Sequence, residues 1–283
     1  MFKVEKMKQK DLSFAVKLAN TMNWNMTKAD FTFNMKMEPE GCLMLKDNGV
    51  AVGLATCISY EKVGWFGNLI VEEWCREHGA GTMLVKHATE YLQSKGVTTI
   101  GLYGYKHLVN FYGSVGFKQD VDFSVLKTEQ IKGPNDLDDS LKTAEPTQRD
   151  ISQMIELDAE CFGGSRTKLL DTILQEKSNL IFFHKEKNRV TGFSAAKVYE
   201  GIAEVGPLVC NKTQKKTAKK LFSAVLNKLE GSEAYMYVQA DETELIEEAS
   251  RFGLKEEFKL ARMFLGPPVQ KDCTYLAESL ERG

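Results

Sequence analysis

The chain has 283 residues, of which 43% are hydrophobic and 27% are charged, and its formal net charge is -2. This length and composition allow two globular domains of ordinary size. The near-zero charge argues against nucleic acid or an acidic membrane as a partner. No segment approaches the roughly 18 to 20 apolar residues that span a bilayer, and segment 1–10 lacks the apolar core of a secretory signal. We therefore expect a cytoplasmic protein; its oligomeric state is left open.

Six cysteines are scattered along the chain, without a CxxC motif or a partnering pair of histidines. This spacing is unlike that of a metal site or a disulfide scaffold. Several lie in apolar runs, where a thiol behaves as a small hydrophobic group. We expect no bound metal and reduced thiols at all six positions, which are Cys42, Cys57, Cys75, Cys161, Cys210 and Cys273.

In the first half, segments 42–45 and 50–60 are predicted strands that turn at Asp47-Asn48-Gly49, a strong hairpin signal. Segment 65–71 is a third strand. A helix follows, with apolar positions spaced as on one half-buried face; they are Ala80, Met83, Leu84, His87 or Ala88, Tyr91 and Leu92. Gly96 ends this helix, and a further strand is expected over 98–103.

The second half repeats this order of elements. Segments 180–183 and 190–198 flank a polar turn, and 203–209 is the next strand. The helix that follows carries one apolar face, formed by Ala218, Leu221, Phe222, Val225, Leu226 and Leu229. Segment 234–238 is the later strand.

The spacing within the two halves agrees. Val71 precedes Ala80 by 9 residues, and Val209 precedes Ala218 by the same number. A closing glycine lies 45 residues after the first valine and 44 after the second. The match favours an internal duplication. Because segment 127–150 is polar and reads as a linker, we predict an N-terminal domain over 1–128 and a C-terminal domain over 145–283.

One loop of the first half carries an anion-binding pattern, Arg76-Glu-His-Gly79-Ala-Gly81-Thr82, between a strand and a helix. A helix start leaves several backbone N–H groups unpaired, and glycines let this backbone approach a pyrophosphate closely. Arg76 adds a charge suited to phosphate. A P-loop motif is absent, and a dinucleotide fingerprint would need glycine where Leu84 stands.

Segment 69–84 resembles motif A of the GNAT superfamily, the acetyl-CoA loop Q/R-x-x-G-x-G/A. Segment 111–117, FYGSVGF, resembles that superfamily's FYxxxGF element. Two looser stretches, 23–30 and 157–166, resemble the GWN…D and LD…FGxxR segments of its tandem, two-domain group. The resemblance covers nearly the whole chain and implies an α/β fold. Two GNAT-like domains would each carry a largely antiparallel, V-shaped sheet flanked by helices.

The resemblance also implies an activity, an N-acetyltransferase that transfers acetyl from acetyl-CoA to a primary amine in a ternary complex. Tyr112 would be the general acid that protonates the leaving thiolate. The backbone of Leu69, Ile70 and Val71 would pair with the pantetheine arm. The pyrophosphate would be held by a longer set, namely Arg76, Glu77, His78, Gly79, Ala80, Gly81 and Thr82.

On the acceptor side the candidates are Trp24 and Asn25, with Asp30, although a helix-capping turn explains the same pattern. Phe162, Gly163 and Arg166 could cover the site from the second half. Tyr105 departs from the superfamily, whose members often carry asparagine there. The sequence assigns no general base.

In the second half, the positions of Arg76, Gly79 and Gly81 hold Gln214, Thr217 and Lys219, and Ala249 stands in place of Tyr112. We expect this copy not to bind acetyl-CoA productively and to shape the acceptor site or the interdomain contact. Its lysine-rich helix start is expected to be a solvated face. The alternatives to a catalyst of acetyl transfer are a non-catalytic acyl-CoA sensor or scaffold, and an enzyme that loads a longer acyl chain.

Overall fold

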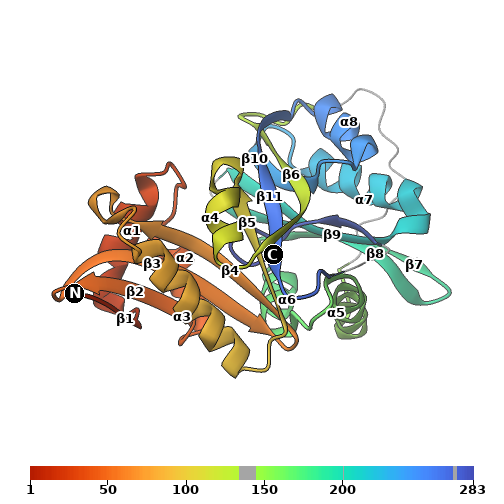
Figure 1. The fold of residues 1–283 in the computed structure, drawn as a ribbon. Helices are drawn as coiled ribbons and strands as arrows, with labels where there is room; N and C mark the ends of the chain where they lie inside the picture. The colour runs from red at the N-terminus through yellow and green to blue at the C-terminus, as the bar shows by residue number, and fades with distance from the viewer. Residues whose placement is uncertain (134–144, 200, 270–272) are drawn as a thin grey trace.

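The computed structural model describes residues 1–133, 145–199, 201–269 and 273–283, so part of the expected linker, residues 134–144, lies outside the described residues. The described strands form one twelve-stranded mixed sheet with helices on its faces (Figure 1), as the predicted fold class requires. The strand order is β1-β2-β3-β4-β5-β11-β6-β10-β12-β9-β8-β7.

The strands of the first half are β1 (Phe2–Lys6), β2 (Cys42–Asp47), β3 (Val50–Tyr60), β4 (Val63–Val71), β5 (Thr99–Tyr105) and β6 (Lys118–Thr128). Its helices are α1 (Leu12–Asn20), α2 (Lys28–Met37), α3 (Ala80–Ser94) and α4 (Val109–Ser114). Each of the strands and the helix predicted for this half is present, with ends that differ by a few residues.

The strands of the second half are β7 (Leu180–Glu186), β8 (Arg189–Tyr199), β9 (Ile202–Asn211), β10 (Glu233–Gln239), β11 (Lys255–Leu265) and β12 (Cys273–Leu276). Its helices are α5 (Gln148–Phe162), α6 (Thr167–Gln175), α7 (Lys215–Lys228) and α8 (Thr243–Arg251). Here too the predicted strands and helix are present.

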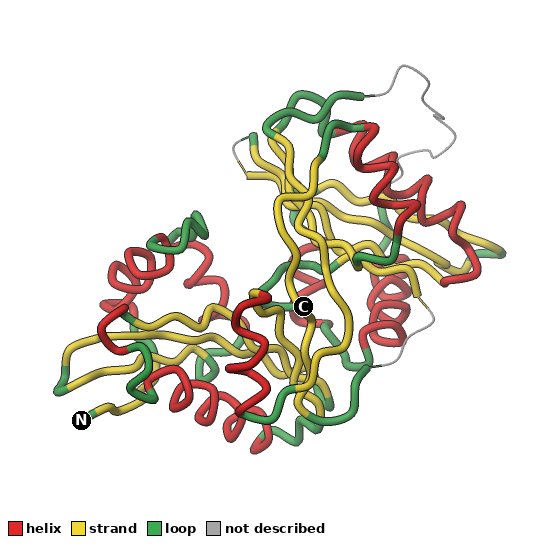
Figure 2. The backbone as a smooth tube through the Cα atoms, turned by 45° about the horizontal axis from the view of Figure 1, so that its top comes forward, coloured by secondary structure: helices red, strands yellow, loops and turns green. Residues whose placement is uncertain are grey.

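Alternation along the strands separates the core into layers on opposite faces of the sheet. In β2, Leu43 and Leu45 pack with α3, whereas Met44 packs with α1. In β9, Leu208 and Cys210 pack with α7, whereas Val209 packs with α5. Each half of the sheet is therefore covered on both faces, as Figure 2 also shows.

The two halves exchange strands at the centre of the sheet. β11, from the second half, lies between β5 and β6 of the first half and is antiparallel to both. β6 in turn pairs with β10, from Ala234 opposite Thr128 to Gln239 opposite Phe123. The predicted division of the sequence at 128 and 145 stays a prediction, and these pairings join the two halves into one sheet.

A bulge stands at the same place in each half. In β4, Ile70 pairs with Leu54 and Gly67 pairs with Thr56, so two residues, Asn68 and Leu69, lie opposite one residue of β3. In β9, Leu208 and Val205 enclose an equivalent pair of residues opposite one residue of β8. A bulge bends its strand and increases the twist. Each bulged strand therefore diverges from its parallel neighbour after only three or four paired residues.

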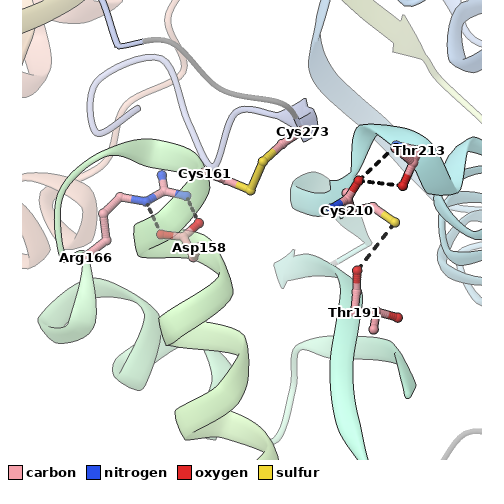
Figure 3. The surroundings of a disulfide bond; sticks show 8 residues. Asp158, Cys161, Arg166, Thr191, Cys210, Thr213 and Cys273 are labelled. Atoms are coloured by element: carbon pink, nitrogen blue, oxygen red, sulfur yellow. Dashed lines mark hydrogen bonds and ion pairs between the residues drawn. A yellow bond between two sulfur atoms is a disulfide. The ribbon is translucent and has the colours of Figure 1, made fainter. Parts of the chain in front are cut away.

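One expectation about the cysteines is wrong. The structure joins Cys161, in the last turn of α5, to Cys273, the first residue of β12, in a disulfide (Figure 3). The sequence separation of 112 residues hid this pairing. The other four cysteines are free and buried, which agrees with their expected role as small hydrophobic groups.

Candidate active site

The divergence of β4 from β5 leaves an open slot in the first half. These parallel strands pair only from Val63 opposite Thr99 to Trp65 opposite Gly101. Beyond the bulge, Ile70 and Val71 keep their pairing with β3, and no strand of the described chain pairs with the other edge of segment 69–71. An unpaired strand edge offers backbone N–H and C=O groups to an extended ligand. Leu69, Ile70 and Val71, the residues predicted to pair with the pantetheine arm, line this edge, and that pairing stays a prediction.

The predicted phosphate loop lies directly after this edge, at the start of α3. Arg76, Glu77, His78 and Gly79 are exposed. Glu77 and Gly79 both adopt left-handed backbone conformations, with φ of 62° and 79°, which glycine tolerates at position 79 without strain. The next residues, Ala80, Gly81 and Thr82, open the helix, so their N–H groups have no acceptor within it. The loop and the helix dipole together suit an anion.

Tyr112 lies on α4 against the open end of β5. A Cβ at Gly104 would come within 2.9 Å of the Tyr112 ring, so glycine at this position lets the ring lie against the strand. Phe111 and Phe117 pack edge-on against the same ring. Burial raises the pKa of the Tyr112 phenol, which keeps it protonated at neutral pH.

Trp24 lies on the opposite face of β5 from Tyr112. Its indole Nε1 donates a hydrogen bond of 3.0 Å to the hydroxyl of Tyr105, the residue that stands where the superfamily often has asparagine. Asn25 has φ of 52° and shapes the turn. Asp30 accepts from the Thr27 backbone N–H and forms a capping box, so its role is the helix cap that the sequence also allowed.

The expected cover from the second half is not formed by Phe162, Gly163 and Arg166. Arg166 is fully buried and donates from Nε and Nη2 to Asp158 at 3.0 and 2.6 Å (Figure 3). Its guanidinium stacks on Phe162, 4.3 Å from the ring centroid. Gly163 ends α5 in a left-handed conformation. Phe162 in turn packs against Trp65 of the first half, with ring centroids 5.8 Å apart. Arg166 is therefore occupied with partners inside the second half.

In the second half, the corresponding slot is filled by the chain itself. β9 and β10 pair from Ile202 opposite Glu233 to Val205 opposite Met236 and then diverge. β12 enters this gap and pairs antiparallel with β9, from Cys273 opposite Asn211 to Leu276 opposite Leu208. It also pairs with β10 at Val238. The edge that remains open in the first half is thus occupied in the second.

The second half also has no counterpart of the phosphate loop. α7 begins at Lys215, three residues earlier than α3 when Val209 is matched to Val71. Thr217 consequently lies inside the helix. Lys215 and Lys219 at the helix start form ion pairs with Glu244 and Glu248 of α8, at 3.6 and 3.0 Å, so this basic face is partly neutralised rather than only solvated.

A buried chain of charges near the first-half slot was missed by the sequence analysis. Lys197 pairs with Glu204 at 2.6 Å and with Glu278, and Arg282 pairs with Glu278 at 3.0 Å and with Glu281. Burial raises the pKa of Glu204 to about 7. The signal in the sequence was a charged residue at an inward position of an apolar strand, as at Lys197 in β8.

The charge chain touches the first half on the face that carries Trp24. A Cβ at Gly67 would meet the Glu281 backbone at 2.5 Å, just before the bulge of β4. Arg282 donates to Asn34 of α2 at 3.3 Å and stacks over Phe33. The last described residues lie near the middle of the molecule, between the halves (Figure 1). The second half therefore supplies charge beside the slot of the first.

Across residues 1–133, 145–199, 201–269 and 273–283, no group of three or more histidine, cysteine or acidic side chains could hold a metal ion. Over the same ranges, no helix is both long and apolar enough to cross a membrane.

Two family models match the chain, one in each half. The acetyltransferase (GNAT) family model matches residues 12–117, and an acetyltransferase (GNAT) domain model matches residues 154–276. The chain is a tandem GNAT protein. The matched ranges contain both bulged strands, which agrees with the duplication predicted from spacing. No curated protein matches the chain significantly.

Solved structures share this tandem GNAT architecture. A proposed acetyltransferase from Pyrococcus horikoshii aligns with a TM-score of 0.81 and 20% identity, over 100% of this chain and 96% of the other. A GCN5-related N-acetyltransferase from Sphaerobacter thermophilus aligns with a TM-score of 0.68 and 14% identity, over 96% of this chain and 98% of the other. A tandem GNAT protein from the clavulanic acid biosynthesis pathway aligns with a TM-score of 0.62 and 12% identity, over 95% of this chain and 100% of the other. At these identities the likeness concerns the fold.

Proposed function

We propose that the first half is an acetyl-CoA-dependent N-acetyltransferase that acts on a primary amine of a small molecule or a peptide. The observation that carries this proposal is the open slot between β4 and β5, flanked by the loop 76–82 on one side and by Tyr112 on the other. Direct attack by the amine needs no metal. A cytoplasmic location belongs to the same proposal, and the Cys161–Cys273 disulfide counts against it, because disulfides are rare in reducing compartments.

The donor would bind along the loop and the slot. The backbone edge of Leu69, Ile70 and Val71 would pair with the pantetheine arm, and Arg76 with the exposed amides up to Thr82 would hold the pyrophosphate. The bound acetyl-CoA would supply an activated acyl group. As the C–N bond forms and the C–S bond breaks, Tyr112 would donate its phenolic proton to the departing sulfur. The proton lost by the amine nitrogen would restore the phenol through water.

The acceptor would approach from the other face of β5. The donor and Tyr112 occupy the face that α3 and α4 cover, so the amine needs access from the face with Trp24. The charge chain at this face contains three carboxylates and two cations. Because burial raises the pKa of Glu204 to about 7, the chain carries little net charge at neutral pH and does not by itself select between a cationic and an anionic acceptor.

Turnover with Tyr112→Phe tests the proposal. The hydroxyl contributes to the chemical step only, so we expect kcat for thiol release, with a panel of amines, to fall by about 100-fold or more. The dissociation constant of acetyl-CoA should stay the same. Tyr199→Phe changes an exposed tyrosine and serves as the control. Tight acetyl-CoA binding without thiol release for any amine would instead establish the acyl-CoA sensor, and preference for a longer acyl-CoA would establish the third alternative.

A further inference from the structure

The chain that follows β12 crosses β4 directly before its bulge. Trp65 Nε1 donates a hydrogen bond of 3.1 Å to the backbone carbonyl of Leu280. Two residues further along β4, a Cβ at Gly67 would come within 2.5 Å of the Cα of Glu281. Phe66, between these two positions, packs with α3 on the opposite face. Since alternate residues of a strand face the same way, Glu281 lies beside the slot on the face away from α3, from which the amine would approach.

The carboxylate of Glu281 is held toward α2. Its Oε1 accepts a hydrogen bond from Nη1 of Arg282, and the same Nη1 donates to Oδ1 of Asn34, on α2, at 3.3 Å. Arg282 also donates from Nε and Nη2 to Glu278, at 3.0 and 3.2 Å. Each nitrogen of the guanidinium is therefore engaged, and Arg282 fixes the carboxylate of Glu281 between β4 and α2.

Glu281 is the most accessible member of the charge chain. Its side chain is 17% exposed, whereas those of the other four members are 8% exposed or less. Its second oxygen, Oε2, is open to solvent and has no hydrogen-bond partner within the described residues. The charge chain as a whole carries little net charge, but the group that it presents to a ligand is a carboxylate oxygen.

Aromatic side chains lie on the other side of the slot, on and beside β5. Leu280, next to Glu281, packs in the apolar cluster that also includes Tyr105. The ring centroid of Tyr105 is 5.7 Å from that of Phe258, and its hydroxyl accepts a hydrogen bond from Trp24. A carboxylate oxygen binds an ammonium by charge-assisted hydrogen bonds, and aromatic rings attract the same cation. The chemistry of this corner of the slot therefore suits a primary ammonium with a short hydrocarbon stem.

We propose that Glu281 receives the amine of the acceptor: its Oε2 binds the ammonium and takes the proton that the nitrogen must lose before it attacks. This role rests on the function proposed above. The ammonium gives one proton to the carboxylate, which passes it to solvent. The neutral nitrogen then forms the C–N bond as the C–S bond breaks, and its next proton restores the phenol of Tyr112 through water. The second half in this way completes the active site of the first.

Binding of propylammonium to the whole chain, followed by protein-observed NMR, tests the ammonium contact without turnover. Propylammonium and propanol have nearly the same shape and differ in charge. We expect propylammonium to bind about 10-fold more tightly, the effect of one charge-assisted hydrogen bond. Glu281→Gln should abolish this preference, and Glu281→Asp should keep most of it. Equal binding of the two ligands to wild type, or an unchanged preference in Glu281→Gln, overturns the proposal.

Glu247→Gln is the matched control, because it removes one negative charge from an exposed position of α8. It should leave the preference for propylammonium unchanged. Glutamine keeps the shape of Glu281, and its amide oxygen can still accept from Arg282, so we expect Glu281→Gln to fold. Wild type provides a measurement that does not depend on this variant: the NMR shifts caused by propylammonium should centre on Gly67 and Glu281. Shifts confined to other parts of the chain overturn the proposal.

Kinetics with two amines tests the proton transfer. At neutral pH ethylamine is an ammonium ion, whereas trifluoroethylamine is mostly uncharged and has no proton to lose before it attacks. Glu281→Gln should lower kcat/KM by about 100-fold for ethylamine and by less than about 3-fold for trifluoroethylamine, with the KM for acetyl-CoA unchanged. Equal losses for the two amines overturn the proton transfer. If wild type releases no thiol with any amine, the proposed function fails, while the propylammonium result still decides whether Glu281 binds an ammonium.

Discussion

The two halves of this tandem GNAT protein diverge at the same bulge and use the resulting gap in different ways. In the first half, the edge of β4 that faces β5 has no strand paired with it after Asn68, among the described residues. In the second, β12 pairs along β9 and reaches β10 at Val238. A gap of this kind is a backbone-binding site, and a strand from the same chain satisfies it as well as a ligand would.

The helix that follows the gap also starts differently in the two halves. Left-handed residues delay the start of α3 and leave amides exposed over the gap, whereas α7 begins three residues earlier and contains Thr217. A loop that binds phosphate and a slot that binds an extended arm are useful only together. The second half has neither. Its strands instead complete the sheet, and it supplies charge beside the slot of the first half, on the face that carries Trp24.

The largest expected effect concerns the segment that fills the second gap. Cys161→Ser removes the disulfide that ties β12 to α5. Because the disulfide spans 112 residues, we expect the free energy of unfolding to fall by about 4.8 kcal/mol, as loop-closure entropy predicts. Urea unfolding measures it. Wild type treated with a reductant is the control and should lose the same amount. Equal stability of oxidised and reduced wild type would contradict this assignment.

The next effect concerns acetyl-CoA binding, and it distinguishes the start of α3 from the start of α7. Arg76→Ala with Gly79→Asp should weaken acetyl-CoA binding by about 100-fold, or about 2.7 kcal/mol, because a charge-assisted contact is lost and a negative charge faces the phosphates. The matched change, Gln214→Ala with Thr217→Asp, should alter the dissociation constant less than 2-fold. Calorimetric titration measures both. Comparable losses from both pairs would show that the second half also binds the donor, and no loss from the first would refute the loop assignment.

The smallest effect concerns a contact between the halves. Glu38, at the end of α2, accepts hydrogen bonds from Ser59, Tyr91 and Lys168 of α6. Burial alone would raise its pKa, but these partners outweigh burial and hold the pKa at about 2. The folded-state pKa is depressed, so the stabilisation is complete above the ordinary value of 4.5 and is lost as the pH falls through about 2.

Glu38→Gln should therefore lower the free energy of unfolding by about 1.5–3 kcal/mol at pH 7, and by less at pH 3. Urea titrations at the two pH values measure the difference. Glu40→Gln changes an exposed neighbour paired with Lys6 and should cost below about 0.5 kcal/mol. A difference between wild type and Glu38→Gln that grows as the pH falls would contradict the role of Glu38.

The elements of each half could be predicted because their signals are local. The hairpin at Asn48-Gly49, the apolar face from Ala80 to Leu92 and the loop at Gly79 each depend on residues a few positions apart. Equal spacing from Val71 and Val209 then indicated the duplication. Most candidate residues for the donor lie together for the same reason, since β4 and the loop at the start of α3 follow one another in the sequence. Tyr112 lies on α4, after α3 and β5, and reaches the same core by tertiary packing.

The acceptor side could not be predicted in this way. Arg166 and Phe162 matched a family pattern and were expected to cover the site, but their surroundings depend on Asp158 and Trp65. Tyr105 was a departure from a motif, and its bond to Trp24 joins residues that lie 81 positions apart. The charge chain brings together β8, β9 and the segment after β12. Hydrophobic periodicity within one element does not predict contacts between such distant segments.

The sequence by itself determined the repeated order of elements, the loss of the glycine loop and of the tyrosine in the second copy, and the family resemblance. Only the tertiary structure decided that β11 inserts between β5 and β6, that β12 occupies the second gap, and that Cys161 meets Cys273. Hydrophobic periodicity specifies which face of an element is buried, but it does not name the partner. The partner is selected by packing and backbone pairing between segments that are distant in the sequence, and these interactions exist only in the folded chain.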